Sequence, residues 1–138
     1  MQLKYYCPTD FSGLETLLKK AGVYYEPLDR EDIIRKKIEY DPSSIIIAQE
    51  SGQIIGTVFI IYDPWLSFVY HLGVHPQHRG KGAADSLMNE AEKILSERGV
   101  RIATLFIEEG NEKSIDFYKR RAWNVMYKCT NMEKILNF

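Results

Sequence analysis

The sequence contains few cysteines and no long apolar run, and both scarcities exclude classes of protein. Its two cysteines, Cys7 and Cys129, lie far apart and form no Cys-x-x-Cys pair, which disfavours a disulfide framework and a structural zinc site. The apolar runs at 45–48 and 57–61 are the length of strands and too short to cross a bilayer. The first ten residues lack the apolar stretch of a signal peptide. We therefore expect a cytoplasmic protein.

An excess of charge of one sign is also missing. The chain carries 18 Lys and Arg against 19 Asp and Glu, a formal net charge of −1. No overall field then attracts nucleic acid or an anionic membrane, and we expect neither as a partner. The 138 residues, 45% of them hydrophobic, fit one globular domain over 1–138.

The order of apolar patterns predicts an α/β (α+β) fold, a sheet covered by helices. Alternating or continuous apolar runs predict strands at 2–7, 44–49, 53–61, 65–74 and 102–107, followed by a β-rich segment at 123–136. Amphipathic patterns predict helices at 10–21, 29–41, 80–98 and 111–121, with Asp10 and Asp29 as N-caps of the first two. The first has an apolar stripe of Leu14, Leu17 and Leu18, and Gly22 follows it, where a helix end favours a residue that can adopt a positive φ. The segment 65–107 reads as a strand–helix–strand unit, which predicts a parallel strand pair.

The most informative segment is 72–84, Leu-Gly-Val-His-Pro-Gln-His-Arg-Gly-Lys-Gly-Ala-Ala. An apolar strand ends there, and Gly80 and Gly82 open a long helix. Glycines let backbone N–H groups approach an anion, and a helix N-terminus favours negative charge, so a pyrophosphate suits this place. Arg79 and Lys81 add positive charge. The alternative is that the glycines only permit a tight turn; the spacing of a Walker A loop or a dinucleotide-binding fingerprint is absent.

Two motifs give the segment a more specific meaning. Gln77, Gly80 and Gly82 match the Q/R-x-x-G-x-G/A cofactor motif, and 111–123 resembles the N-x-x-(A/S)-x-x-(F/L)-Y helix of the same family. In both motifs and in the order of elements, the chain resembles the GNAT family of N-acetyltransferases, in its compact bacterial and archaeal form. The resemblance implies a mixed, mostly antiparallel twisted sheet with a parallel, splayed strand pair and about four helices.

The resemblance also implies roles for particular residues. Acetyl-CoA (coenzyme A) would lie where the strands 65–74 and 102–107 splay apart, with its pyrophosphate on the glycine-containing turn. Tyr118 matches the tyrosine that protonates the departing CoA thiolate; the alternative is a packing role beside Phe117. The residues implied to bind the cofactor are Leu72, Gly73, Val74, Gln77, His78, Arg79, Gly80, Lys81, Gly82, Ala83, Asn111, Ser114 and Tyr118.

The sequence departs from the family pattern in three places, one of which is the pair Ala83-Ala84 instead of a bulkier Ile-Gly or Ile-Ala. Ala122 replaces a glycine at the end of the last helix. The usual positions of a general-base glutamate hold Phe68 and Phe106. An ordered water, or one of the side chains Tyr70, His71 and Glu26, would then have to take the proton of the acceptor amine.

The acceptor site and the metal content are read from fewer signals. The residues predicted to contact an amine acceptor are Tyr25, Glu26, Asp63, Trp65 and Tyr70. His71, His75 and His78 fall on a strand and a turn, where their rings need not converge, so we expect no metal.

These observations predict an enzyme that transfers acetyl from acetyl-CoA to a primary amine by direct attack in a ternary complex. A homodimer is compatible with this reading. The alternatives are a non-catalytic acyl-CoA sensor of the same fold and an interaction domain that binds no CoA.

Overall fold

The computed structural model describes residues 1–137. They divide into two compact units, Met1–Leu105 and a second that begins at Phe106. The expectation of a single domain over 1–138 stays a prediction. Within the described part of the chain, no helix combines the length and the apolar character needed to span a membrane.

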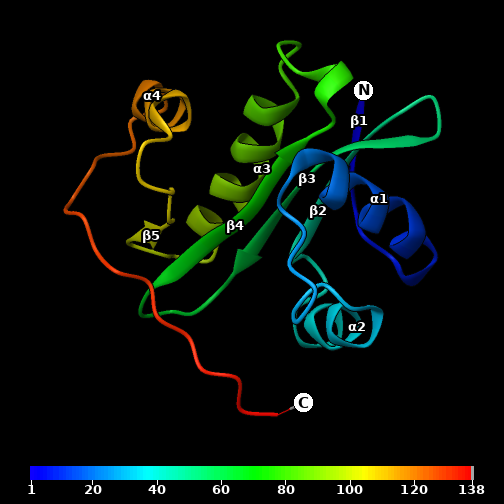
Figure 1. Ribbon diagram of the computed structural model, residues 1–138, viewed down its shortest axis with the longest axis horizontal. Coiled ribbons are helices and arrows are strands. Elements are labelled where there is room, and N and C mark those ends of the chain that lie inside the picture. The colour runs from blue at the N-terminus through cyan, green and yellow to red at the C-terminus, as the bar shows by residue number, and fades with distance from the viewer. Residues whose placement is uncertain (138) are drawn as a thin grey trace. The chain divides into compact units, whose positions relative to one another are not determined.

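The first unit is built on a five-stranded sheet in the order β1-β2-β3-β4-β5 (Figure 1). Three antiparallel ladders join the first four strands, and a parallel ladder joins the last two, which confirms the predicted mixed sheet with one parallel pair. The strands are β1 Gln2–Tyr5, β2 Ile45–Glu50, β3 Gln53–Ile61, β4 Ser67–Val74 and β5 Ala103–Thr104.

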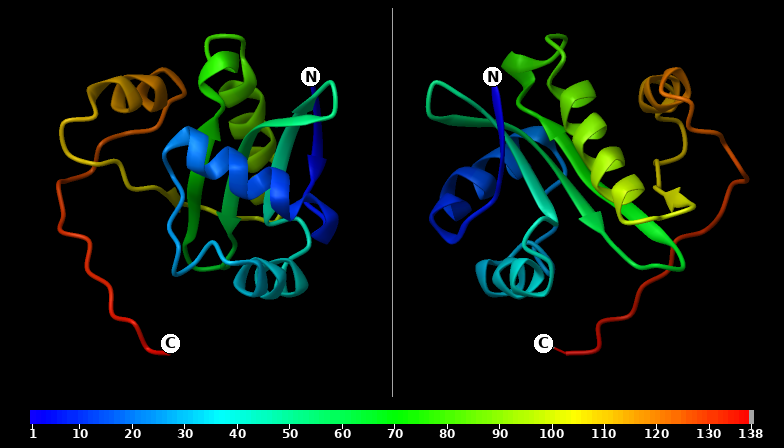
Figure 2. Two further views of the ribbon diagram at one scale, coloured as in Figure 1. Left: turned by 45° about the vertical axis from the view of Figure 1, so that its right-hand side comes forward. Right: turned by 180° about the vertical axis from the view of Figure 1, so that it is seen from behind.

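Helices cover both faces of this sheet (Figure 2). They are α1 Phe11–Ala21, α2 Glu31–Tyr40 and α3 Ala83–Glu97. On β2, Ile45 and Ile47 belong to the cluster packed by α1 and α2, and Ile46 between them is also fully buried. Strands buried on two faces read as continuous apolar runs, which explains the Ile-Ile-Ile-Ala sequence at 45–48.

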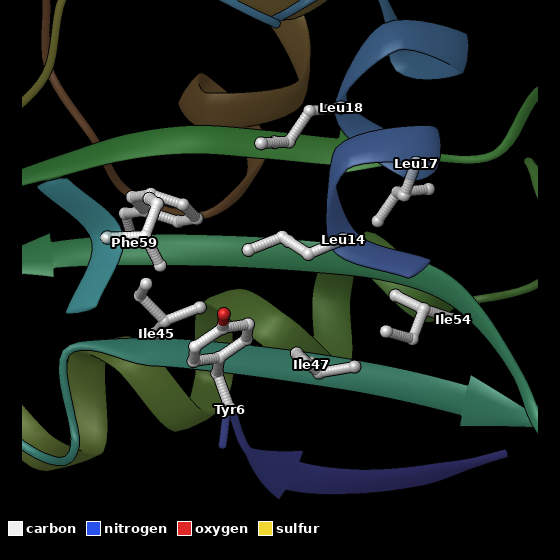
Figure 3. Packing of buried hydrophobic residues seen from close by; sticks show 9 residues of the cluster. Tyr6, Leu14, Leu17, Leu18, Ile45, Ile47, Ile54 and Phe59 are labelled. Carbon is white, nitrogen blue, oxygen red and sulfur yellow. The ribbon is translucent and has the colours of Figure 1, made fainter. Parts of the chain in front are cut away.

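The main core cluster lies between the sheet and the two N-terminal helices (Figure 3). The predicted stripe of α1, Leu14, Leu17 and Leu18, is buried there, and Gly22 ends the helix in the left-handed conformation, as the sequence predicted. The buried members of the cluster are Tyr6, Leu14, Leu17, Leu18, Ile34, Ile45, Ile47, Ile54 and Phe59.

Asp10 is at the predicted N-cap position and Asp29 is not, and neither side chain caps its helix, because both carboxylates bind other donors. Asp10 precedes α1 but caps no helical N–H with its side chain; its carboxylate accepts from the Cys7 N–H and the Lys4 ammonium. Helix α2 begins at Glu31 after Arg30, so Asp29 lies outside it. Asp29 is 2% exposed and faces β4 instead.

The C-terminal third of the chain contains less β structure than predicted. Of the strand predicted at 102–107, only Ala103–Thr104 is a strand. Ile102, which begins the apolar run that predicted it, is 63% exposed. The second unit contains one helix, α4 Glu112–Arg120, and residues 123–137 form no strand. An apolar β pattern does not show which segment it would pair with, and a strand forms only where such a neighbouring strand is present.

Burial of a lysine at the edge of the main cluster generates a prediction. The Lys37 ammonium donates to the Ile60 carbonyl at 2.6 Å and lies 5.8 Å from the centre of the Phe59 ring. Burial lowers its pKa from 10.5 to about 8. Between those pH values the unfolded chain holds a proton that the folded chain has lost, so stability rises with pH. Measured against Lys37→Met by urea unfolding, the free energy of unfolding should gain roughly 2–3 kcal/mol over that window. A difference independent of pH would contradict the burial of the charge.

Candidate cofactor and catalytic site

A hydrogen-bonded turn links the end of β4 to α3. The His75 N–H donates to the Ile55 carbonyl at 2.7 Å, and the His75 Nδ1 accepts from the Gln77 N–H at 3.1 Å, at the start of a short 3-10 helix, η2 Pro76–His78. The Arg79 Nε then donates to the Val74 carbonyl at 3.1 Å. These bonds fix the turn before the two glycines begin.

The glycine turn, residues 77–83, has a backbone that suits an anion. Gly80 and Gly82 have φ values of +75° and +90°, and a Cβ on either would meet no atom within 4 Å. The first helical bond of α3 runs from the Ser86 N–H to the Gly82 carbonyl, so the N–H groups of 83 and 84 have no acceptor within the helix. Open space, donors and the positive end of a helix dipole together fit a phosphate. Asp85 in the same turn partly offsets the charges of Arg79 and Lys81.

The edge of β4 remote from β3 is open along its second half. β5 pairs with β4 only at Ser67 and Phe68. The His75 N–H donates to the Ile55 carbonyl, next to β3 residue Gly56, whereas the Val74 carbonyl accepts from Arg79 Nε. Backbone groups alternate along a strand, so those of Leu72 and Val74 point to the edge away from β3. An extended chain with amide groups, such as pantetheine, could pair with that edge as a strand would. The residues present therefore fit the predicted cofactor.

β4 contains one residue more than β3 opposite it. The register shifts between the pairs Thr57–Gly73 and Phe59–Tyr70, and His71, within the shift, has a φ of +51°. A β-bulge re-aims the side chains next to it. His71 Nε2 lies 2.8 Å from Asp29 Oδ2, and its ring meets the Phe59 ring edge-on at 4.9 Å.

The pairing of His71 with Asp29 is the contact that sequence reasoning missed. His71 was one of three side chains considered for the amine proton, whereas Asp29 was assigned to a helix cap. The two are 42 residues apart, and no pattern in the sequence links them. The only available signal was that Asp29 sits just before a helix whose first turn already contains Glu31 and Asp32.

The structure brings some of the predicted acceptor residues together and separates others along β4. The Tyr25 N–H donates at 2.8 Å to Asp29 Oδ2, the atom that His71 Nε2 also contacts. Tyr70 directly precedes His71 on β4 and pairs with Phe59 on β3. Asp63 instead caps the turn before β4 by accepting from the Trp65 N–H at 2.8 Å, and Trp65 is 87% exposed. No contact of Glu26 supports or contradicts its predicted role.

The predicted residues of the second unit lie on and before α4. Asn111 caps this helix by accepting from the Ser114 N–H at 3.2 Å. The Tyr118 ring meets the rings of Phe117 and Trp123 at 5.1 and 6.0 Å, so the packing contact weighed as its alternative role exists. Burial raises the pKa of Tyr118 to about 12.

The histidines are arranged in two separate settings. His71 faces Asp29, whereas the rings of His75 and His78 meet edge-on at 5.5 Å, and His78 Nδ1 lies 3.1 Å from Glu50 Oε2. Among residues 1–137, no group of three or more His, Cys, Asp or Glu side chains is placed to hold a metal ion.

A family model for the acetyltransferase (GNAT) family matches residues 12–123. The chain belongs to the GNAT acetyltransferase family. It is also 31% identical over 136 residues to an acetyltransferase of Pectobacterium atrosepticum, a match that covers 99% of this chain and 96% of that protein.

Solved GNAT structures share the fold at low sequence identity. A PaiA N-acetyltransferase from Thermoplasma acidophilum, solved with coenzyme A, has a TM-score of 0.77 and 17% identity over 87% of each chain. A protein from Bacillus halodurans described as a transcriptional regulator has a TM-score of 0.81 and 18% identity, over 96% of this chain and 99% of its own. Membership of the family and the CoA complex support an acetyltransferase that uses acetyl-CoA or CoA.

The left-handed backbone of Gly82 in this GNAT turn makes a prediction about stability. Gly82→Ala adds a Cβ that touches nothing but disfavours the φ of +90°, which should cost roughly 1–2 kcal/mol. Gly82→Asn should cost less, because asparagine tolerates positive φ better than alanine does. Urea unfolding of the three proteins measures both differences. Equal stability of Gly82→Ala and the wild type would contradict the observed turn.

Proposed function

We propose that this GNAT protein transfers the acetyl group of acetyl-CoA to a primary amine by direct attack in a ternary complex. The observation that carries the proposal is the glycine turn at the start of α3, directly after the open edge of β4. One continuous segment then offers donors for a pyrophosphate and an edge for the pantetheine arm. The free, exposed thiols of Cys7 and Cys129 favour a reducing compartment, the cytoplasm.

The proposed cofactor contacts follow this segment. Backbone N–H groups of the glycine turn would hold the pyrophosphate, with Gln77, His78, Arg79 and Lys81 around it. The edge at Leu72 and Val74 would pair with pantetheine, and one of its N–H groups would polarise the thioester carbonyl. Asn111 and Ser114 would contact the pantetheine arm.

Tyr118 is proposed as the acid that protonates the leaving thiolate. Its pKa of about 12 keeps it protonated at neutral pH, so the proton is available. A thiol has a pKa near ~8.5, so a complete transfer from such a tyrosine to the thiolate is uphill by roughly 5 kcal/mol. The transfer is easier if the tyrosine oxygen takes up a proton from the attacking nitrogen as it gives its own to sulfur. Tyr118 then acts as a relay between nitrogen and sulfur.

A panel of amines tests the proposed reaction. Spermidine, free lysine, an aminoglycoside and peptides with a free N-terminus are each incubated with acetyl-CoA, and the released CoA thiol is measured. Turnover that depends on the amine, with an acetylated amine found by mass spectrometry, supports the proposal. Tight CoA binding without turnover of any amine would favour the sensor, and no CoA binding would exclude both.

A charge placed in the glycine turn should weaken cofactor binding. Gly82→Glu puts a carboxylate against the proposed pyrophosphate position, whereas Gly82→Gln adds the same volume without charge. In calorimetry with CoA, Gly82→Glu should lower the affinity at least tenfold more than Gly82→Gln does, at low salt. Equal affinities of these two folded variants would place the pyrophosphate elsewhere.

Removal of the Tyr118 hydroxyl should slow the chemical step. Tyr118→Phe keeps the ring contacts with Phe117 and Trp123, so stability and CoA affinity should change little. Loss of a positioned proton donor should lower the single-turnover rate by about 10²–10⁴-fold. A folded Tyr118→Phe enzyme with the wild-type single-turnover rate would leave Tyr118 with a packing role only.

A further inference from the structure

His71 is held in a backbone conformation that its residue type normally avoids. Its φ of +51° lies in the left-handed region, and the extra residue of β4 in the bulge falls at this point. Such strain persists only where the surroundings enforce it. Glycine would remove the strain, yet the chain has a histidine there.

Asp29 fixes the ring of His71 in one orientation. The carboxylate is 2% exposed, and Oδ2 accepts from the Tyr25 N–H at 2.8 Å and meets His71 Nε2 at 2.8 Å. A carboxylate can only accept, so Nε2 carries the proton, and Nδ1 holds the lone pair of the neutral ring. The Phe59 ring meets the imidazole edge-on, with 4.9 Å between the ring centres, and restrains it from a further side.

The bulge places His71 on β4 directly before the part of the strand whose edge is open. His71 directly precedes Leu72, whose backbone faces that edge, and its side chain contacts the segment between α1 and α2 through Asp29. Because Gly73 has no Cβ, the end of α1 and the residues after it can lie close to β4. A Cβ on Gly73 would come within 2.9 Å of Ala21 and 3.3 Å of Val23. The charged groups around the ring are the Asp29 carboxylate and, across Phe59, the Lys37 ammonium.

We propose that His71 is the general base of the acetyl transfer and that Asp29 is its positioning residue. This inference rests on the proposed function, because it requires an amine acceptor and acetyl-CoA. Phe68 and Phe106 occupy the positions where the family resemblance implies a general-base glutamate. The His71 imidazole, oriented by the buried Asp29 carboxylate, would take the role of that glutamate. Histidine also changes charge between pH 5 and 8, the range in which a base for an ammonium is useful.

The proposed step balances in protons and electrons. An acceptor R–NH₃⁺ gives one proton to His71 Nδ1, and the free nitrogen lone pair forms the C–N bond at the thioester carbonyl. The C–S bond then breaks, and its electron pair leaves with the CoA thiolate. A second proton from the nitrogen reaches that sulfur, giving the amide and CoA–SH. His71 returns its proton to water.

Two variants test the base and its positioning separately. His71→Gly removes the imidazole and relieves the strained φ, while Asp29 keeps the Tyr25 N–H as a donor; urea unfolding checks that the variant is folded before rates are compared. With the best acceptor of the amine panel, the single-turnover rate should fall about 10²–10⁴-fold, and added imidazole should restore part of it in this variant but not raise the wild-type rate. The acid limb of the kcat/KM profile should vanish, leaving a rate that rises with pH towards the pKa of the amine.

Asp29→Asn should remove the carboxylate charge without removing the ring. Both bonds end on one oxygen, Oδ2, so the asparagine carbonyl can take its place and accept from the Tyr25 N–H and from Nε2. In ¹⁵N spectra of the imidazole, the wild type and Asp29→Asn should therefore both show the Nε2–H form. We expect kcat to fall by at least tenfold while CoA affinity holds, and the acid limb of the kcat/KM profile to move to lower pH, because the imidazolium loses its counter-charge.

Asp41→Asn is the matched control. Asp41 pairs with Arg98 through two hydrogen bonds at 2.7 and 3.1 Å, away from β4. This variant should lose stability but keep the wild-type pH profile and the Nε2–H form. Wild-type rates in His71→Gly, or a loss of rate that imidazole does not restore while Asp29→Asn keeps its activity, would overturn the proposal. Absence of any amine acetylation by the wild type would instead overturn the proposed function.

Discussion

The pairing of β4 with β3 determines where the functional groups of the first unit lie. At its start, β4 bonds to both neighbours, and after Phe68 it bonds to β3 alone. The single extra residue in β4 shifts the register there, turns His71 towards Asp29 and leaves Leu72 and Val74 on the open edge. Without that shift, each residue from 71 onward would face the opposite side of the sheet. Binding edge and proposed base therefore depend on the same irregularity.

The local electrostatics are set by a few buried groups. The chain has a net charge of −1, so attraction of an anionic cofactor depends on the donors of the glycine turn rather than on a global field. The Asp29 carboxylate requires hydrogen-bond donors and has two, the Tyr25 N–H and His71 Nε2. Across Phe59 from His71, burial disfavours the charge of Lys37 and lowers its pKa to about 8. At pH 7 a lysine with that pKa is still mostly protonated, and its ammonium binds the Ile60 carbonyl rather than Asp29.

Local patterns predicted the parts of the fold that depend on neighbouring residues. β3 was predicted with its observed bounds, and the buried leucines of α1 and the position of the glycine turn followed from periodicity and from Gly80 and Gly82. Long-range pairing could not be read in the same way. Asp29 resembled a helix cap in sequence, but its partner His71 is 42 residues away. The segment 123–136 has a β pattern, but whether it forms a strand depends on a neighbouring strand elsewhere in the chain, which its own sequence does not reveal.

Amide NMR spectra with and without acetyl-CoA test the central claim most directly, that the open edge of β4 and the glycine turn form one binding surface. Backbone amides at Leu72 and Val74 lack a β5 partner, and those of 83 and 84 lack an acceptor within the helix. The account predicts that acetyl-CoA shifts these four resonances most and slows their hydrogen exchange, while those of α2 stay unchanged. Strong perturbation of α2 with none at Leu72, Val74 and the start of α3 would contradict it.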